Sequence, residues 1–282
     1  MTNTSIASSD SQSIPASVLW VMTIATGMIV GNLYYCQPLL SDMQTTLGGS
    51  EVLAGWIPTL TQLGYALGML LLVPLGDRFE RRGLIVISTF ISGLAMIGLS
   101  QAPTLGFAIA MSLLVGVSTV APQFIIPFAA HLAPEEKRGQ VVGTVMSGLL
   151  LGILLARTVA GFIGSAYGWR SMFAIAALAM VILSVLLRFM LPKSEPTFRG
   201  SYLELLRSVF HFIRTEPVLR ETMVFGSLMF AAFGAFWATL IHLMESEVFN
   251  LGARTVGIFG VFGALGALMA PVVGKLADRK SP

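Results

Sequence analysis

The sequence predicts an all-α membrane protein, because of its composition, its long apolar stretches and its uneven distribution of positive charge. Its 282 residues are 55% hydrophobic and 11% charged, and its mean hydropathy is +0.82. Soluble globular proteins have about 25% charged residues, so most of this chain cannot form a water-facing surface. The net charge of +3 is small, and Cys36 is the single cysteine. We therefore expect the lipid bilayer as a partner, and no nucleic acid, metal or cofactor.

Eight apolar stretches are long enough to cross a bilayer, which takes a helix of about 20 mostly apolar residues. They comprise residues 17–40, 52–75, 83–101, 105–132, 140–165, 172–190, 218–244 and 255–274. Residues 1–16 are polar and contain no Lys or Arg, so we expect a disordered cytoplasmic tail there and no signal peptide.

Positive charge predicts the orientation of the bundle. With the N-terminus inside the cell, only Arg170 and Arg254 fall in outer loops, and Arg157 lies within a span. The inner loops then hold Arg78, Arg81, Arg82, Lys137, Arg138, Arg188, Lys193, Arg199, Arg207, Arg214, Arg220, Lys275, Arg279 and Lys280. This asymmetry is typical of a bacterial-type inner-membrane protein whose N-terminus is cytoplasmic.

One long inner loop, residues 191–217, separates six spans from the two that follow. Within it, Ser201 and Glu204 form a capping-box pattern ahead of an apolar stripe interrupted by Arg207, His211 and Arg214. We expect an amphipathic helix on the inner membrane surface or an ordinary linker helix. The loop marks the boundary between a six-helix half at 17–190 and a two-helix part at 218–282.

An Asp-Arg pair occurs at the inner end of the second span and again after the eighth. The first copy is Leu75-Gly76-Asp77-Arg78-Phe79-Glu80-Arg81-Arg82, and the second is Gly274-Lys275-Leu276-Ala277-Asp278-Arg279. Two related halves of a helical bundle are typical of secondary transporters.

These motifs resemble those of the major facilitator superfamily, whose signature after the second span has a Gly-x-Leu-Ala-Asp-Arg-x-Gly-Arg-Arg pattern. The fifth span resembles the motif of the drug–proton antiporter branch at Gly143, Gly152, Ala156, Ala160 and Gly161, with Arg157 in place of a proline. The resemblance implies a secondary transporter that moves a small organic solute by alternating access, of efflux-type antiporter character. Protons are a candidate coupling ion, although the first six spans contain no obvious buried carboxylate.

The resemblance also implies a cytoplasmic gate. It comprises Asp77, Arg78, Arg81, Arg82, Asp278 and Arg279. Each Asp would face the positive N-terminal end of a helix in the other half. In the alternative interpretation, the arginines serve only as topology anchors.

Small residues recur four apart along the fifth span and predict a helix-packing seam. They are Thr144, Gly148, Gly152, Ala156, Ala160 and Gly164, beside Gly143 and Gly161. Such spacing lets membrane helices approach closely. Sliding at this seam during transport is an implication of the resemblance, and static packing is the alternative.

Polar side chains at membrane depth predict a substrate cavity. The candidates are Asn32, Tyr34, Tyr35, Gln37, Gln62, Gln123 and Arg157. Polar groups in hydrocarbon need partners, so these should point inward. An inward Arg157 favours anionic or polar substrates or couples to a carboxylate. The alternatives are snorkelling of Arg157 to the outer interface and plain interhelical hydrogen bonds for the others.

Members of the superfamily have twelve spans, whereas this sequence predicts six plus two. We therefore expect a truncated transporter that is inactive alone unless a second piece supplies spans nine to twelve. A non-transporting membrane scaffold, or the remnant of a disrupted transporter gene, is the alternative. An intramembrane enzyme is not expected, since the sequence contains no Ser-His, paired-Asp or zinc-protease constellation.

Overall fold

A computed structural model describes residues 14–196, 198, 200–245 and 249, and in these residues the secondary structure is entirely helical. The helices are α1 (Ala16–Gly31), η1 (Gln37–Leu39), α2 (Leu40–Leu47), α3 (Glu51–Ala54), α4 (Trp56–Leu72), α5 (Leu75–Arg78), α6 (Arg81–Ser100), α7 (Leu105–Ser118), α8 (Ala121–Leu132), η2 (Glu135–Lys137), α9 (Arg138–Tyr167), α10 (Trp169–Met190), α11 (Tyr202–Thr215) and α12 (Pro217–Glu245). The expected tail, except for its last three residues, and the expected span 255–274 lie outside the described residues.

Six helical segments of the described chain are long and apolar enough to cross a membrane. They are Glu51–Arg78, Arg81–Ser100, Leu105–Leu132, Glu135–Tyr167, Trp169–Met190 and Pro217–Trp237. These segments correspond to the second to seventh expected spans, so the all-α membrane architecture is confirmed.

The first expected span is not one continuous helix. Helix α1 ends at Gly31, turns follow through Cys36, and the chain resumes as η1 and α2. Pro38 explains the interruption, because proline has no backbone N–H and its ring clashes with the carbonyl four residues earlier. The Tyr34 carbonyl instead accepts a bond from the Gln37 N–H at 3.2 Å. The expected span, residues 17–40, runs through this proline.

The segment predicted to form the six-helix half contains three closely packed helix pairs: α1 with α9, α4 with α7, and α6 with α10. Glycine makes the first two of these contacts possible. A Cβ on Gly27 of α1 would lie 2.6 Å from the carbonyl oxygen of Gly148 on α9, and one on Gly68 of α4 would lie 2.6 Å from that of Val117 on α7. Backbones therefore touch where no side chain fits, as is usual for membrane helices.

Arg170 fixes one end of the bundle. From the start of α10, its guanidinium donates to the carbonyls of Ser100 and Ala102, both at 2.9 Å, and lies 4.3 Å from the Trp169 ring. These bonds tie α10 to the short turn between α6 and α7, so this arginine of the predicted outer loops has a structural partner.

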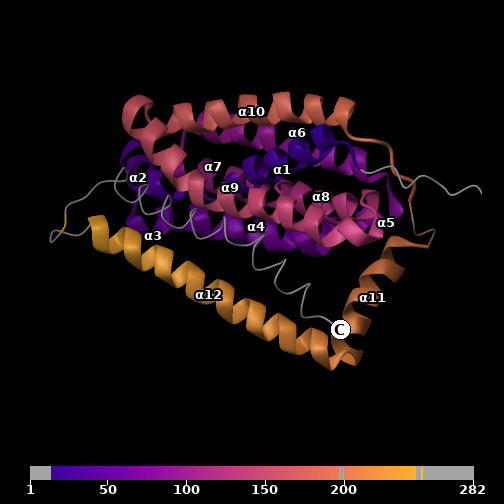
Figure 1. The fold of residues 1–282 in the computed structure, drawn as a ribbon. Coiled ribbons are helices and arrows are strands. Elements are labelled where there is room, and N and C mark those ends of the chain that lie inside the picture. Colours follow the sequence, from indigo (N-terminus) through magenta and orange to yellow (C-terminus); the bar gives the residue numbers. More distant parts are fainter. Residues whose placement is uncertain (1–13, 197, 199, 246–248, 250–282) are drawn as a thin grey trace, which may run out of the picture.

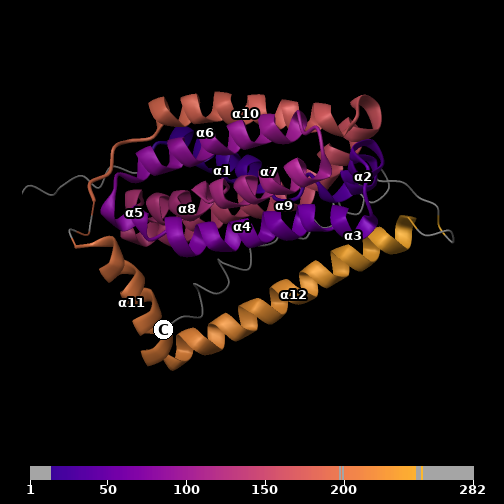
Figure 2. The ribbon, with the colours of Figure 1, turned by 180° about the vertical axis from the view of Figure 1, so that it is seen from behind.

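Helix α12 lies outside the six-helix half and runs obliquely along it. Figures 1 and 2 show its C-terminal part close to α3 and its N-terminal part farther from the bundle, where α11 bridges the gap. The space between α12 and the bundle is where the two cavities described below are found.

Candidate functional site

A cavity of about 330 Å³ lies between the six-helix half and α12. Its walls come from the turn after α1, from η1, α2, α4 and α9 on one side and from α12 on the other. The lining residues are Tyr34, Gln37, Leu40, Pro58, Gln62, Arg157, Phe230, Phe233, Gly234 and Trp237. The cavity thus combines one cation and two amides with an aromatic wall.

Arg157 is the central charged group of this cavity and is only 1% exposed. Its Nε donates to the Gln37 side-chain oxygen at 2.9 Å, and one Nη donates to the Ile153 carbonyl at 3.0 Å. The guanidinium carbon lies 4.6 Å from the Tyr34 ring centroid and 4.4 Å from that of Trp237. Because Trp237 belongs to α12, the charge links the six-helix half to the helix that follows the linker.

No carboxylate forms an ion pair with Arg157 within the described residues; the two ion pairs found there are Arg81–Asp77 and Arg82–Glu80. Arginine inside a membrane span is unfavourable by about 2.5–3.5 kcal/mol on insertion scales, and such residues usually face a protein interior or a cavity. Two hydrogen bonds and three aromatic rings, those of Tyr34, Trp237 and Phe233, compensate part of this penalty. Snorkelling, the alternative interpretation, does not match this inward geometry.

The predicted cavity residues divide into two groups. Tyr34, Gln37, Gln62 and Arg157 line the cavity, whereas Asn32, Tyr35 and Gln123 do not. Asn32 is buried and donates to Ser92 Oγ at 3.0 Å, and Tyr35 packs against the hydrophobic core. Gln123 donates to the Tyr65 hydroxyl at 2.7 Å and lines a second cavity. For Asn32 and Gln123, the interhelical hydrogen bond is therefore the observed role.

The aromatic wall on α12 was not predicted. Phe230, Phe233 and Trp237 follow helical spacing, so they share one face of α12. The sequence contains this spacing, but apolar residues occur on every side of the helix. Hydrophobic periodicity therefore does not distinguish the face that lines the cavity. Trp237 is 5% exposed, whereas the neighbouring Phe236 is 60% exposed.

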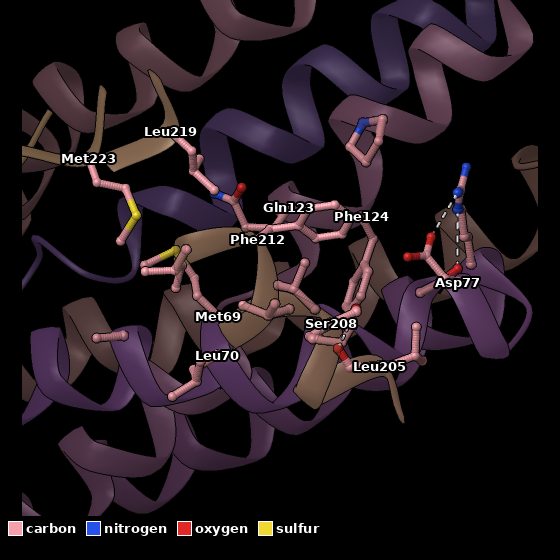
Figure 3. A pocket seen from close by; sticks show the side chains of 18 residues that line it. Met69, Leu70, Asp77, Gln123, Phe124, Leu205, Ser208, Phe212, Leu219 and Met223 are labelled. Carbon is pink, nitrogen blue, oxygen red and sulfur yellow. Dashed lines mark hydrogen bonds and ion pairs between the residues drawn. The ribbon is translucent and has the colours of Figure 1, made fainter. Parts of the chain in front are cut away.

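A second cavity, of about 770 Å³, lies at the other end of α12 (Figure 3). Its walls come from α4, α5, the start of α6 and α8 on the bundle side and from α11 and the start of α12 on the other. Met69, Leu70, Phe212 and Met223 make much of it apolar, and Asp77 lies at its edge.

The linker between the two parts is bonded to the segment that contains Asp77. The Phe198 N–H donates to the Asp77 carbonyl at 2.9 Å, and the Arg81 N–H donates to Ser194 Oγ at 2.9 Å. The Tyr202 hydroxyl donates to the Leu71 carbonyl at 2.6 Å. The linker therefore follows the end of α4 and α5 and sets where α11 begins.

The predicted gate residues have distinct partners. Arg81 lies 3.4 Å from the Asp77 carboxylate, Arg82 lies 3.2 Å from Glu80, and Arg78 lies over the Phe79 ring at 5.7 Å. Asp278 and Arg279 lie outside the described residues. The predicted contact of each Asp with the N-terminal end of a helix in the other half stays a prediction.

The predicted seam residues follow the α1–α9 contact for most of its length. A Cβ on Gly152 would lie 2.5 Å from the Gly27 Cα, Gly148 abuts Thr23, and Gly164 abuts Leu39. Ala156, Ala160 and Gly161 are buried. A Cβ on Gly143 would meet nothing within 4 Å, so this glycine lies beyond the contact.

One family model and several curated relatives match most of this chain. A family model described as Major Facilitator Superfamily matches residues 19–282. The Escherichia coli K12 protein "Putative uncharacterized transporter YgaY" is 43% identical over 265 residues, which cover 94% of this chain and 67% of the relative. "Probable transporter SCO4007" of Streptomyces coelicolor is 30% identical over 260 residues, which cover 92% of this chain and 60% of the relative.

Two sugar transporters are also similar. The "D-xylose transporter" of Levilactobacillus brevis is 33% identical over 160 residues, covering 56% of this chain and 34% of the relative. The solved structure of the proton:xylose symporter XylE bound to 6-bromo-6-deoxy-D-glucose superposes with a TM-score of 0.70 at 15% identity, covering 94% of this chain and 69% of that one. At that identity, the structural likeness shows a shared fold alone.

Proposed function

The chain belongs to the major facilitator superfamily, and from this premise we propose that it moves a small organic solute by alternating access, as an efflux-type antiporter. The superfamily is one of membrane transporters and not of enzymes. The small-residue pattern of α9, which resembles the antiporter branch, supports the efflux direction.

The observation that carries the proposal is the Arg157 cavity. It lies between the helices that precede the linker and α12, which we take as the first helix of the second half, and both sides contribute side chains to it. Secondary transporters bind their substrates at such an interface between repeats. A solute held there contacts both halves, so its binding can bias their relative movement.

The arrangement of α12 supports alternating access. Near Trp237 the helix contacts the bundle through Arg157, whereas near Leu219 and Met223 the larger cavity separates it from α4 and α8. We propose that this larger cavity lies on the cytoplasmic side, in a chain whose N-terminus is inside and whose membrane is the bacterial inner membrane. The solute would enter there from the cytoplasm.

Transport is expected to need more than this chain. The chain spans about two thirds of the length of its curated relative YgaY. Because alternating access needs two halves that rock against each other, we propose that transport also requires the spans that complete the second half in this relative.

Transport assays with everted membrane vesicles test the proposal. We expect proton-driven solute accumulation when the chain is co-expressed with spans nine to twelve of a relative, and none with the chain alone. Trp237→Leu should lower the rate, because it removes a cavity wall. Phe236→Leu is the matched control, since this neighbour is exposed on another face and does not line the cavity. No transport in any combination would favour a scaffold.

Sugar uptake by proton symport is a second candidate, favoured by the similarity to the D-xylose transporter over 160 residues. The same vesicles distinguish the two candidates. A symporter drives D-xylose out of everted vesicles when the interior is acidified, whereas an antiporter accumulates its solute.

A further inference from the structure

We propose that the solute is a small aromatic organic anion, whose charge binds Arg157 and whose ring lies against the aromatic face of α12. This inference rests on the proposed function, because it names the substrate class of the same cavity. Charge, shape and the geometry of the guanidinium each support it.

The charge of the cavity favours an anion. Arg157 is the one charged residue among those that line it, and no carboxylate pairs with it within the described residues. The residues that contact its N–H groups, Gln37 and Ile153, provide neutral oxygens. A carboxylate that meets a buried guanidinium gains charge-assisted hydrogen bonds, whereas an organic cation would be repelled.

A single buried cation also limits the charge of the solute. One carboxylate balances the charge of Arg157, and a second would be buried without a partner, which is strongly unfavourable. The amides of Gln37 and Gln62 can receive neutral polar groups. The cavity thus fits a monoanion better than a dianion.

The aromatic wall on α12, which adjoins Arg157, favours a flat apolar body. Phe230 and Phe233 stack with ring centroids 6.3 Å apart, and Phe233 meets Trp237 edge to face at 6.2 Å. Aromatic rings attract another ring in offset or edge-to-face geometry by about 0.5–1.5 kcal/mol beyond the area they bury. A neutral sugar, by contrast, offers no charge with which the Arg157 guanidinium could pair.

The position of the guanidinium shows how an anion would reach it. The Tyr34 and Trp237 rings lie near its central carbon, at 4.6 and 4.4 Å. Gln37 occupies Nε and Ile153 occupies one Nη, while the other Nη has no hydrogen-bond partner within the described part of the chain. An incoming carboxylate binds there, and the neighbouring Trp237 then lies beside the body of the same ligand.

Binding measurements on the full chain in nanodiscs test the substrate class. The probe is radiolabelled indole-3-acetate, an aromatic monoanion whose bicyclic ring suits a cavity of about 330 Å³. The competitors are indole-3-acetamide, which is its neutral isostere, cyclohexylacetate, which keeps the charge without the aromatic ring, and D-xylose. We expect the amide to compete at least about tenfold more weakly than the acid, because a hydrogen bond to a charged group is lost.

Variants assign the effect to the named residues. Arg157→Gln should abolish the preference for acid over amide, and Arg157→Lys should retain part of it. Trp237→Leu should weaken both ligands while the preference for acid over amide persists. The matched control is Arg188→Gln, which removes an exposed arginine at the end of α10 and should change nothing. Retained binding of the amide by Arg157→Gln shows that this variant is folded.

Several results would overturn the inference. These are equal affinity for acid and amide, an unchanged preference in Arg157→Gln, or no saturable binding of indole-3-acetate. Saturable D-xylose binding that Trp237→Leu removes, with no indole-3-acetate binding, would overturn the substrate class and leave solute transport through this cavity in place.

Discussion

At the residue scale, the contact between α1 and α9 leaves no space for a methyl group. Gly27 and Gly152 face each other across two backbones, and Arg157, farther along α9, bonds to Gln37 in the segment that follows α1. The position of Arg157 therefore depends on how closely these helices approach.

Gly152→Ala should destabilise the protein, because its new Cβ would lie 2.5 Å from the Gly27 Cα. Overpacking of this kind typically lowers the free energy of unfolding by about 1–3 kcal/mol. The measurement is the melting temperature of the purified chain in detergent.

Gly143→Ala is the matched control on the same helix, where a Cβ meets nothing within 4 Å. Alanine is a better helix former than glycine by about 1 kcal/mol, so this variant should be neutral or stabilised. Equal melting temperatures for the two variants would contradict the close approach of α1 and α9.

The sequence indicates which polar residues must point inward, but it does not indicate which residues they contact. Arg157, Gln37 and Asn32 were all recognisable as polar groups in apolar spans that must point inward. Whether they line a cavity depends on neighbours that are distant in the sequence: Gln37 meets Arg157, while Asn32 meets Ser92. The spacing of these residues along the chain does not indicate which of them lines the cavity and which forms an interhelical hydrogen bond.

At the element scale, the sequence predicted helix α11 well. Ser201 Oγ accepts from the Glu204 N–H at 3.3 Å, and Glu204 accepts from the Ser201 N–H at 3.1 Å, so the capping box is present. The box depends only on residues three apart, which is why it could be predicted without knowing the fold. By contrast, the end of α1 at Gly31 required knowing how Pro38 would be accommodated.

Ser201→Ala should loosen the start of α11, since loss of such a cap lowers helix stability by about 1 kcal/mol. Hydrogen exchange measured by mass spectrometry should show faster exchange at the first turn of this helix. Ser201→Thr should exchange like the parent protein, because threonine also caps. If the alanine variant exchanged as slowly as the parent, the cap would contribute nothing and the linker bonds alone would hold α11.

At the scale of the whole molecule, the two parts meet at few places. Within the described residues, the linker bonds at Asp77, Arg81 and Leu71 hold one end, and the Arg157–Trp237 contact holds the other. Figures 1 and 2 show α12 diverging from the bundle between these points. Such an arrangement allows α12 to move without disturbing the three helix pairs.

Asp77→Asn should leave folding and membrane insertion intact and lower transport in the co-expressed system. The Asp77 carboxylate is 54% exposed and lies 3.4 Å from Arg81. Pairs of this kind contribute at most about 1 kcal/mol to stability. Reporter fusions at residues 76–82 and 191–201 should report the cytoplasmic side, and those at 102–104 the outer side, in both the parent and the variant.

Asp42→Asn, a change at the exposed start of α2, is the control and should transport normally. Lost insertion of Asp77→Asn would make Asp77 a structural anchor. Normal transport by Asp77→Asn would contradict the gate hypothesis. The neighbouring arginines would then act only as topology anchors.

The sequence by itself determined the membrane environment, the all-helical class, the approximate spans, the capped linker helix and the superfamily resemblance. All of these depend on composition or on residues close together in the chain, where apolar length and helical period act locally. The tertiary structure decided that α1 pairs with α9, that Gln123 belongs to a cavity away from Arg157, and that Trp237 completes the site. Those outcomes depend on which helices pack together, and packing is decided by the fit between surfaces far apart in the sequence.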